Sequence, residues 1–162
     1  MTTDPTTPPY NEDAEKAVLG SVLLNRDAMT PIAPWLRADD FYLARHQQIF
    51  AAMLACYANR TPPDVRLVAD TLKAAAQLEG IGGVTYLTEL IHSVPSSYHV
   101  EFYAKAVQRD AIKRRIIAAG GKIAALGYDS ELDADAVQSQ AQALLTATAP
   151  TQQRGGFASV GT

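Results

Sequence analysis

The sequence predicts an all-α protein, a compact helical globule followed by a projecting antiparallel helical hairpin. Apolar residues recur at three- and four-residue spacing along most of the chain, which is the period of an amphipathic helix. No stretch of useful length alternates apolar and polar residues as a strand does. The segment from Ser97 to Leu126 reads as one helix of about 30 residues, roughly 45 Å long, so part of it should project from a small globule.

The first predicted helix begins after Asn11, a residue type that caps helix N-termini. Its first turn carries Glu12, Asp13 and Glu15 beside the positive end of the helix dipole. The apolar stripe that should face a core consists of Ala14, Ala17, Val18 and Val22, with Leu19 and Leu23 widening it.

Further helices follow from the same periodicity. Residues 28–36 form a short, irregular apolar stretch, and residues 49–57 then show a strong helical pattern. Asp64, after Pro62-Pro63, caps the next helix, and residues 80–83 (Gly-Ile-Gly-Gly) are predicted to form a turn. Leu87, Leu90, Ile91 and Val94 mark another amphipathic segment, which Pro95 stops.

The last two predicted helices form the hairpin. Ser96 or Ser97 caps the long helix, and Asp133 or Asp135 caps a returning one after a polar turn at residues 128–133. We therefore expect a disordered arm over residues 1–9, a globule over 10–105, a hairpin over 106–148 with 97–105 as its base, and a linker over 149–162.

Composition bounds the function. The 162-residue chain has a formal net charge of −3, which argues against a mainly electrostatic nucleic-acid or membrane binder. Its single cysteine, Cys56, excludes an internal disulfide and a cysteine zinc cluster, and we expect it to be a buried structural thiol. No apolar run of about 18 residues and no signal peptide is present, so a cytoplasmic protein is expected.

Catalytic motifs are not recognisable. The histidines His46, His92 and His99 lack the spacing of a zinc site, so no metal site is predicted, and His46 is expected to form structural hydrogen bonds with Asp39 or Asp40. Residues 120–122 (Gly-Gly-Lys) lack the first glycine and the Ser or Thr of a phosphate-binding loop. We therefore predict no catalytic residue and no cofactor on this chain.

A two-helix hairpin leaves one apolar flank open. Pairing with a second copy of the hairpin into a four-helix bundle is the simplest way to cover that flank. Gly120 and Gly121 are either a local kink or weak spot, or a notch where another helix comes close. From the helical phase, the residues predicted to form the oligomer interface are Ile112, Ile116, Ile123, Leu144 and Leu145.

A basic stretch lies on the same long helix, at Arg109, Lys113, Arg114, Arg115 and Lys122. It is either a solvated helix face or a contact site for an acidic protein surface or a nucleic-acid backbone. The acidic residues at positions 129, 131, 133 and 135 could complement it across a symmetric contact. No aromatic residues interleave the basic ones, which weakens the case for single-strand stacking.

The order of these segments resembles the N-terminal domain of bacterial replicative DNA helicases of the hexameric DnaB type. The matching pieces cover about residues 8 to 148. They are Pro8-Pro9-Tyr10-Asn11 with residues 12–15 and 17–24, Asp40-Phe41-Tyr42 with His46 and Ile49-Phe50, Pro62-Pro63-Asp64, residues 82–87 with Leu90, and Val94-Pro95-Ser96 before Tyr103-Ala104. His99 stands where the family often has Asn, which leaves a local cap or contact in doubt.

The resemblance implies a domain that performs no catalysis itself. Such domains pair through the hairpin and build a collar, a trimer of dimers, on one side of the helicase hexamer. The collar docks primase and shapes the channel for a DNA strand, and a helicase loader is a further expected partner. No membrane contact is implied. Unwinding belongs to a RecA-like ATPase domain, the expected site of ATP and Mg, so the parent protein would be an ATP-dependent DNA helicase.

The tail at residues 154–160 looks like the start of the linker to that ATPase domain, so we expect a fragment of a helicase. The alternative is a stand-alone helical adaptor or inhibitor that binds a helicase or primase. A reading frame that ends at Thr162 favours the adaptor, and one that continues into a phosphate-binding loop excludes it.

Overall fold

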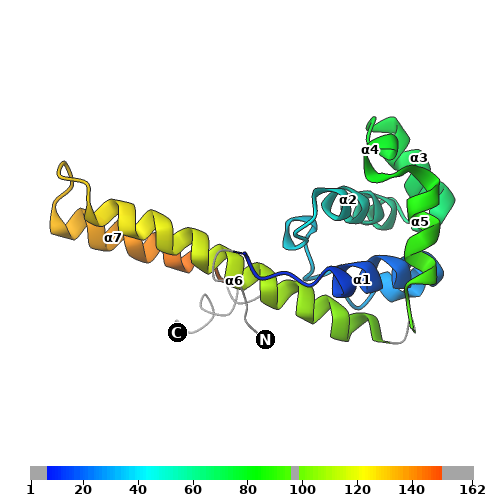
Figure 1. Ribbon diagram of the computed structural model, residues 1–162, viewed down its shortest axis with the longest axis horizontal. Helices are drawn as coiled ribbons and strands as arrows, with labels where there is room; N and C mark the ends of the chain where they lie inside the picture. Colours follow the sequence, from blue (N-terminus) through cyan, green and yellow to red (C-terminus); the bar gives the residue numbers. More distant parts are fainter. Residues whose placement is uncertain (1–6, 96–98, 151–162) are drawn as a thin grey trace, which may run out of the picture. The chain divides into compact units, whose positions relative to one another are not determined.

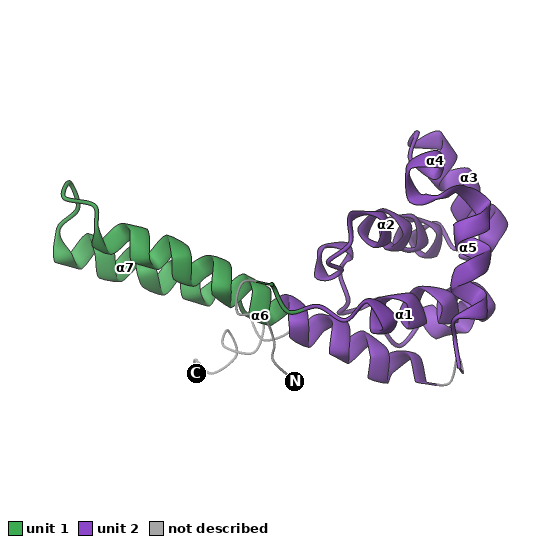
Figure 2. Cartoon of the chain, viewed as in Figure 1, with its two compact units in different colours: residues 1–9, 112–162 green, residues 10–111 purple. Residues whose placement is uncertain are grey.

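The computed structural model describes residues 7–95 and 99–150. Within these ranges the chain has seven α-helices, two short 3-10 helices and no strand, which confirms the all-α prediction (Figure 1). The chain divides into two compact units, one of residues 10–111 and one of residues 1–9 with 112–162 (Figure 2). Most of the predicted N-terminal arm and C-terminal linker lies outside the described residues.

The unit of residues 10–111 contains most of the helices. They are α1 (Glu12–Leu24), η1 (Arg26–Met29), η2 (Ala38–Asp40), α2 (Ala44–Ala58), α3 (Val65–Ala74), α4 (Leu78–Ile81), α5 (Gly83–His92) and the first part of α6 (Val100–Gly127). The predicted cap of α6, Ser96 or Ser97, falls outside the described residues. No helix in the described ranges is long and apolar enough to cross a membrane.

Three predicted N-caps are present as hydrogen bonds. The Asn11 side chain accepts from the Ala14 N–H at 3.0 Å, and the Asp64 side chain accepts from the Leu67 N–H at 2.8 Å. Of the two candidates at the last helix, Asp133 is the cap, since it accepts from the Ala136 N–H. Each cap satisfies a donor that the first turn of a helix leaves without a partner.

The predicted turn at residues 80–83 is wrong in part. Residues 78–81 form the short helix α4, whose last residue, Ile81, is fully buried. Gly82 and Gly83, with φ angles of +109° and +70°, take the positive-φ conformations that glycine adopts without strain. Burial of the Ile81 side chain favours a helical turn here although two glycines flank it.

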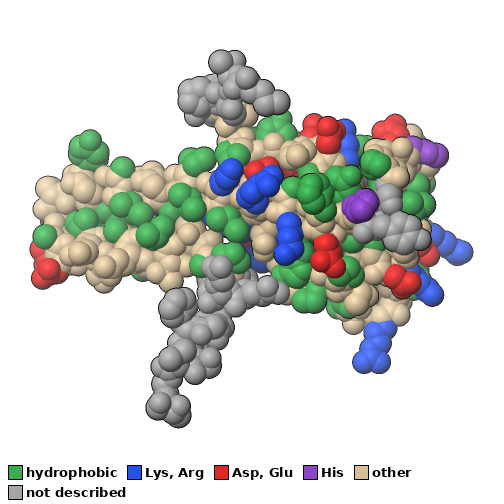
Figure 3. Space-filling view, turned by 90° about the horizontal axis from the view of Figure 1, so that it is seen from below, with side chains coloured by type: hydrophobic (Ala, Val, Ile, Leu, Met, Phe, Trp, Pro, Cys, Tyr) green, Lys and Arg blue, Asp and Glu red, His purple; other side chains and the backbone are tan. Residues whose placement is uncertain are grey.

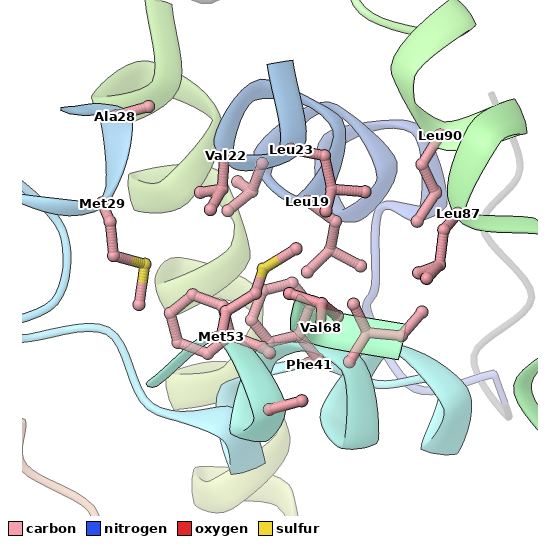
Figure 4. Packing of buried hydrophobic residues seen from close by; sticks show 14 of the residues in the cluster. Leu19, Val22, Leu23, Ala28, Met29, Phe41, Met53, Val68, Leu87 and Leu90 are labelled. Atoms are coloured by element: carbon pink, nitrogen blue, oxygen red, sulfur yellow. The ribbon is translucent and has the colours of Figure 1, made fainter. Parts of the chain in front are cut away.

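One hydrophobic core fills this unit (Figure 4). Phe41 and Phe50 are fully buried with their ring centroids 5.0 Å apart. Leu19 of α1, Met53 of α2 and Leu87 of α5 are also fully buried within the same cluster. Because this core draws on helices throughout the unit, the globule has the burial it needs to be stable by itself.

Helices α1 and α5 cross at Gly20. A Cβ atom built on Gly20 would overlap the Leu90 carbonyl group and the Val94 side chain. The close crossing therefore requires glycine at this position because no side chain fits between the two backbones.

The second unit is an antiparallel helix pair. It contains the later part of α6 and α7 (Ala134–Thr146), joined by a short turn at residues 128–133. Among the described residues 112–150 only Ala119 and Thr148 are buried, and α7 itself buries none. A helix pair with so little core depends on further packing for its stability.

The Gly20 crossing yields a stability prediction. Gly20→Ala is expected to lower the free energy of unfolding by about 2–3 kcal/mol or more, because overpacking against backbone cannot be relieved by a side-chain rotation. Chemical denaturation followed by circular dichroism measures the loss. Gly80→Ala is the matched control, since a Cβ there meets nothing within 4 Å, and its stability should be unchanged or slightly raised. Equal losses in the two variants would contradict the assignment.

Candidate functional site

A buried cluster of Glu15, His46 and Tyr86 is the first place where chemistry could occur. The Glu15 Oε1 lies 2.8 Å from His46 Nδ1, and His46 Nε2 lies 2.6 Å from the Tyr86 hydroxyl. The Tyr42 N–H donates to the other Glu15 carboxylate oxygen at 2.8 Å. A carboxylate, an imidazole and a hydroxyl in line are the components of a catalytic relay.

The cluster is sealed, however. Glu15 is 1% exposed, His46 is fully buried and Tyr86 is 8% exposed. Burial raises the pKa of Tyr86 above its ordinary value, which keeps the hydroxyl protonated. The Arg45 guanidinium lies over the Tyr86 ring, 4.1 Å from its centroid. A substrate cannot reach the relay, so its role is to hold α1, α2 and α5 together.

The predicted partners of His46 are wrong. Both ring nitrogens are taken by Glu15 and Tyr86, from helices distant in sequence. Asp40 instead accepts from the Arg37 N–H, and Asp39 contacts the Arg37 guanidinium at 2.9 Å. Sequence proximity favoured the aspartates, whereas the packing of α1 and α5 against α2 supplies the actual partners.

Other reactive groups are equally enclosed or isolated. Cys56 is buried, with its sulfur 3.6 Å from the Thr71 hydroxyl, as expected for a structural thiol. Within the described ranges no group of His, Cys, Asp or Glu residues could hold a metal ion. The functional candidates that remain in the described ranges are surface residues.

The predicted interface residues separate into two sets. Ile116 and Leu145 are exposed, at 47% and 55%. Ile112, Ile123 and Leu144 are half-buried. Three of the five predicted interface residues are therefore partly shielded from solvent, and two are exposed enough for an external contact.

Two exposed residues of the hairpin escaped the sequence prediction. Ile117 is 61% exposed and Tyr128 is 92% exposed. Gly120 and Gly121 are also exposed, and a Cβ on either would meet no atom within 4 Å. Figure 3 shows hydrophobic side chains in a row along the hairpin. The adjacent pair Ile116-Ile117 was the available signal, because two consecutive isoleucines cannot both face one seam.

The predicted basic stretch is not a uniform surface. Arg109, Lys113 and Lys122 are exposed. Arg114 and Arg115 are half-buried, and the Arg114 guanidinium donates to the Pro9 carbonyl at 2.9 Å. At least one of the five basic residues is therefore engaged within the chain rather than presented to a partner.

A groove of about 620 Å³ lies in the unit of residues 10–111. Ala14, Ala17, Tyr103 and Ala106 supply its buried and half-buried lining. Its exposed lining includes Phe102, 73% exposed, with Lys105 and Arg109 on the next turns of α6. An apolar hollow with charged edges and a protruding aromatic ring is typical of an interaction surface.

Comparison with known proteins places the chain beside replicative helicases. The family model described as the DnaB-like helicase N terminal domain matches residues 7–109. The chain is 39% identical to the replicative DNA helicase DnaB of Geobacillus stearothermophilus and 36% identical to the replicative DNA helicase DnaC of Bacillus subtilis. Each alignment covers 94% of this chain and 34% of the relative, so the chain spans about a third of their length.

Two solved structures share the fold. The N-terminal domain of DnaB helicase from Mycobacterium tuberculosis matches with a TM-score of 0.82 and 36% identity, over 86% of this chain and 99% of that one. A DnaB-like replicative helicase, described with its interactions with primase, matches with a TM-score of 0.70 and 23% identity, over 93% of this chain and 36% of that one.

The buried carboxylate yields a second stability prediction. Glu15→Ala is expected to cost about 3–5 kcal/mol of unfolding free energy, because it leaves His46 and two backbone N–H groups without their acceptor. Thermal and urea unfolding measure the loss. Glu12→Ala on the same helix removes two half-exposed ion pairs, with Lys16 at 2.9 Å and with Arg45 at 3.8 Å, and should cost less than about 1 kcal/mol. Similar losses in both variants would show that the buried cluster does not organise the fold.

Proposed function

The chain belongs to the DnaB-like helicase N-terminal domain family, and from that premise we propose that it serves as the collar domain of a replicative DNA helicase. In this role it mediates assembly into dimers and a hexamer and docks primase, while the catalysis of unwinding belongs to another part of the parent protein. The observation that carries the proposal is the thin hairpin, whose apolar residues Ile116, Ile117, Tyr128 and Leu145 are left exposed by the described parts of the chain.

The energetics of the hairpin support self-assembly. Four of the ten large hydrophobic side chains exposed in the described ranges lie in residues 112–150, namely Ile116, Ile117, Tyr128 and Leu145. Removing apolar surface from water contributes about 25 cal/mol per Å². A second hairpin packed against the first completes a four-helix bundle, and a two-fold contact covers the same face in both copies.

Gly120 and Gly121 fit the same proposal. In a monomer, two glycines inside a helix only lower its stability, by about 1 kcal/mol each relative to Ala. A Cβ on either glycine would meet no described atom within 4 Å, so a partner helix has room to approach the α6 backbone closely. This favours the interpretation of Gly120 and Gly121 as a notch for a partner helix over their interpretation as a weak spot in α6.

Primase is the proposed external partner. One structural neighbour is a DnaB-like replicative helicase described with its interactions with primase. That neighbour supports the fold of this chain, and the shared family supports the same class of partner. The shared family also supports three further proposals for the parent protein. It would bind a helicase loader, pass a DNA strand through its channel, and hold ATP and Mg in its ATPase domain.

Assembly is tested on the chain itself. At about 100 µM, far above a micromolar dissociation constant, we expect dimers or larger rings in sedimentation velocity. Ile116→Glu should give monomers, because it places a charge in the proposed apolar interface between two hairpins, where no opposite charge is available to pair with it.

The matched control is Val84→Glu, since Val84 is 49% exposed on α5 and lies in the other unit. This variant should assemble as the unmodified chain does. A monomeric unmodified chain would contradict the collar proposal, and an Ile116→Glu variant that still assembles would remove that residue from the interface.

Primase docking is tested by co-elution. The primase encoded by the same genome should co-elute with this chain in size-exclusion chromatography and should bind with a micromolar or tighter dissociation constant in calorimetry. Absence of binding at about 100 µM of each protein would contradict the docking part of the proposal while leaving assembly untouched.

A further inference from the structure

We propose that the groove beside Phe102 receives the acidic hairpin tip of a second copy of this chain. We define the hairpin tip as residues 128–135. The inference rests on the proposed self-assembly and adds to it a specific, charge-directed contact. In a two-fold dimer each copy would supply one groove and one tip, so two identical contacts would form.

The tip has the chemistry of an occupant. Its eight residues include four acidic ones, Asp129, Glu131, Asp133 and Asp135, and no basic one. No ion pair in the described ranges involves any of the four. Asp129 and Asp133 bind backbone N–H groups in the turn, whereas the carboxylates of Glu131 and Asp135 are exposed. The tip therefore presents negative charge that no ion pair among the described residues neutralises.

The groove has the complementary charge. Three basic residues line it, Lys16, Lys105 and Arg109, against one acidic residue, Asp13. Lys16 is already paired with Glu12 at 2.9 Å. Lys105, whose ammonium lies 6.0 Å from the centroid of the Trp35 ring, and Arg109 are the basic groups left to meet a partner carboxylate. The Arg109 side chain is 63% exposed. Its Nε lies 3.9 Å from the Asp110 Oδ1, which is a long distance for an ion pair, so a partner carboxylate can replace this contact. Charges placed in this way steer association and set its register more than they add affinity.

The apolar surfaces match as well. Tyr128 of the tip is 92% exposed and Phe102 at the groove is 73% exposed, and they are the two most exposed large hydrophobic residues of the described chain. The groove volume of about 620 Å³ lies within the range of clefts that enclose a drug-sized ligand, so it has room for a tyrosine ring. Its lining of alanines and Tyr103 offers the ring an apolar and aromatic environment.

The test uses charge reversal and mixing. A groove variant carries Lys105→Glu and Arg109→Glu, and a tip variant carries Glu131→Lys and Asp135→Lys. Each variant alone should dimerise at least tenfold more weakly than the unmodified chain in sedimentation equilibrium at low salt. An equimolar mixture should restore dimerisation to within about threefold, because each mixed dimer contains one native contact and one contact with both charges exchanged.

The controls separate charge from fold. Arg66→Glu with Lys73→Glu makes the same charge change on α3, where both side chains are exposed, and should leave the dimerisation constant within about threefold. Tyr128→Ser cannot unfold a chain in which that side chain is 92% exposed, and it should weaken the dimer about tenfold. The tyrosine variant remains informative if a charge variant fails to fold.

The outcomes are distinguishable. Dimerisation of the unmodified chain without weakening in the groove and tip variants would overturn this inference and leave the collar proposal standing. Weakening without restoration on mixing would also overturn it, because the two surfaces would then not meet each other. A monomeric unmodified chain would overturn both. Recovery by mixing, lost as the salt concentration rises, is the expected result.

Discussion

The carboxylate of Glu15 is the group around which the globule is organised. It accepts from the backbone N–H groups of Tyr42 and Leu43 and from His46, whose other ring nitrogen meets Tyr86. A buried carboxylate is costly unless it is fully hydrogen-bonded, so the surrounding segments are held where they can bond to it. The entry to α2, the orientation of α1 and the position of α5 all follow from that requirement.

The Gly20 crossing acts together with this cluster. Tyr86 reaches His46 from α5, the same helix that approaches α1 at Gly20. One contact is polar and the other is steric, but both specify how these helices pack. Together with the apolar core they stabilise the packing of the helices in the unit of residues 10–111.

The hairpin differs from the unit of residues 10–111 in how little of its apolar surface is buried. It buries little within the chain and leaves isoleucine, leucine and tyrosine side chains in solvent. Such surface is unfavourable in a monomer and useful in an assembly, where the same side chains become the interface. The unit of residues 10–111 thus holds the hydrophobic core, while the hairpin exposes apolar surface for the proposed association.

The sequence by itself determined the helical class and the caps at Asn11, Asp64 and Asp133, because periodicity and capping are local properties of the chain. It did not determine the partners of His46, the helix that ends at Ile81, or which of the hairpin isoleucines are shielded from solvent. Those depend on which elements meet in space and on which side chains lose their solvent as a result. Helical phase shows that a stripe is apolar, and only the tertiary structure decides that Ile112 and Ile123 are half-buried while Ile116 and Ile117 stay exposed.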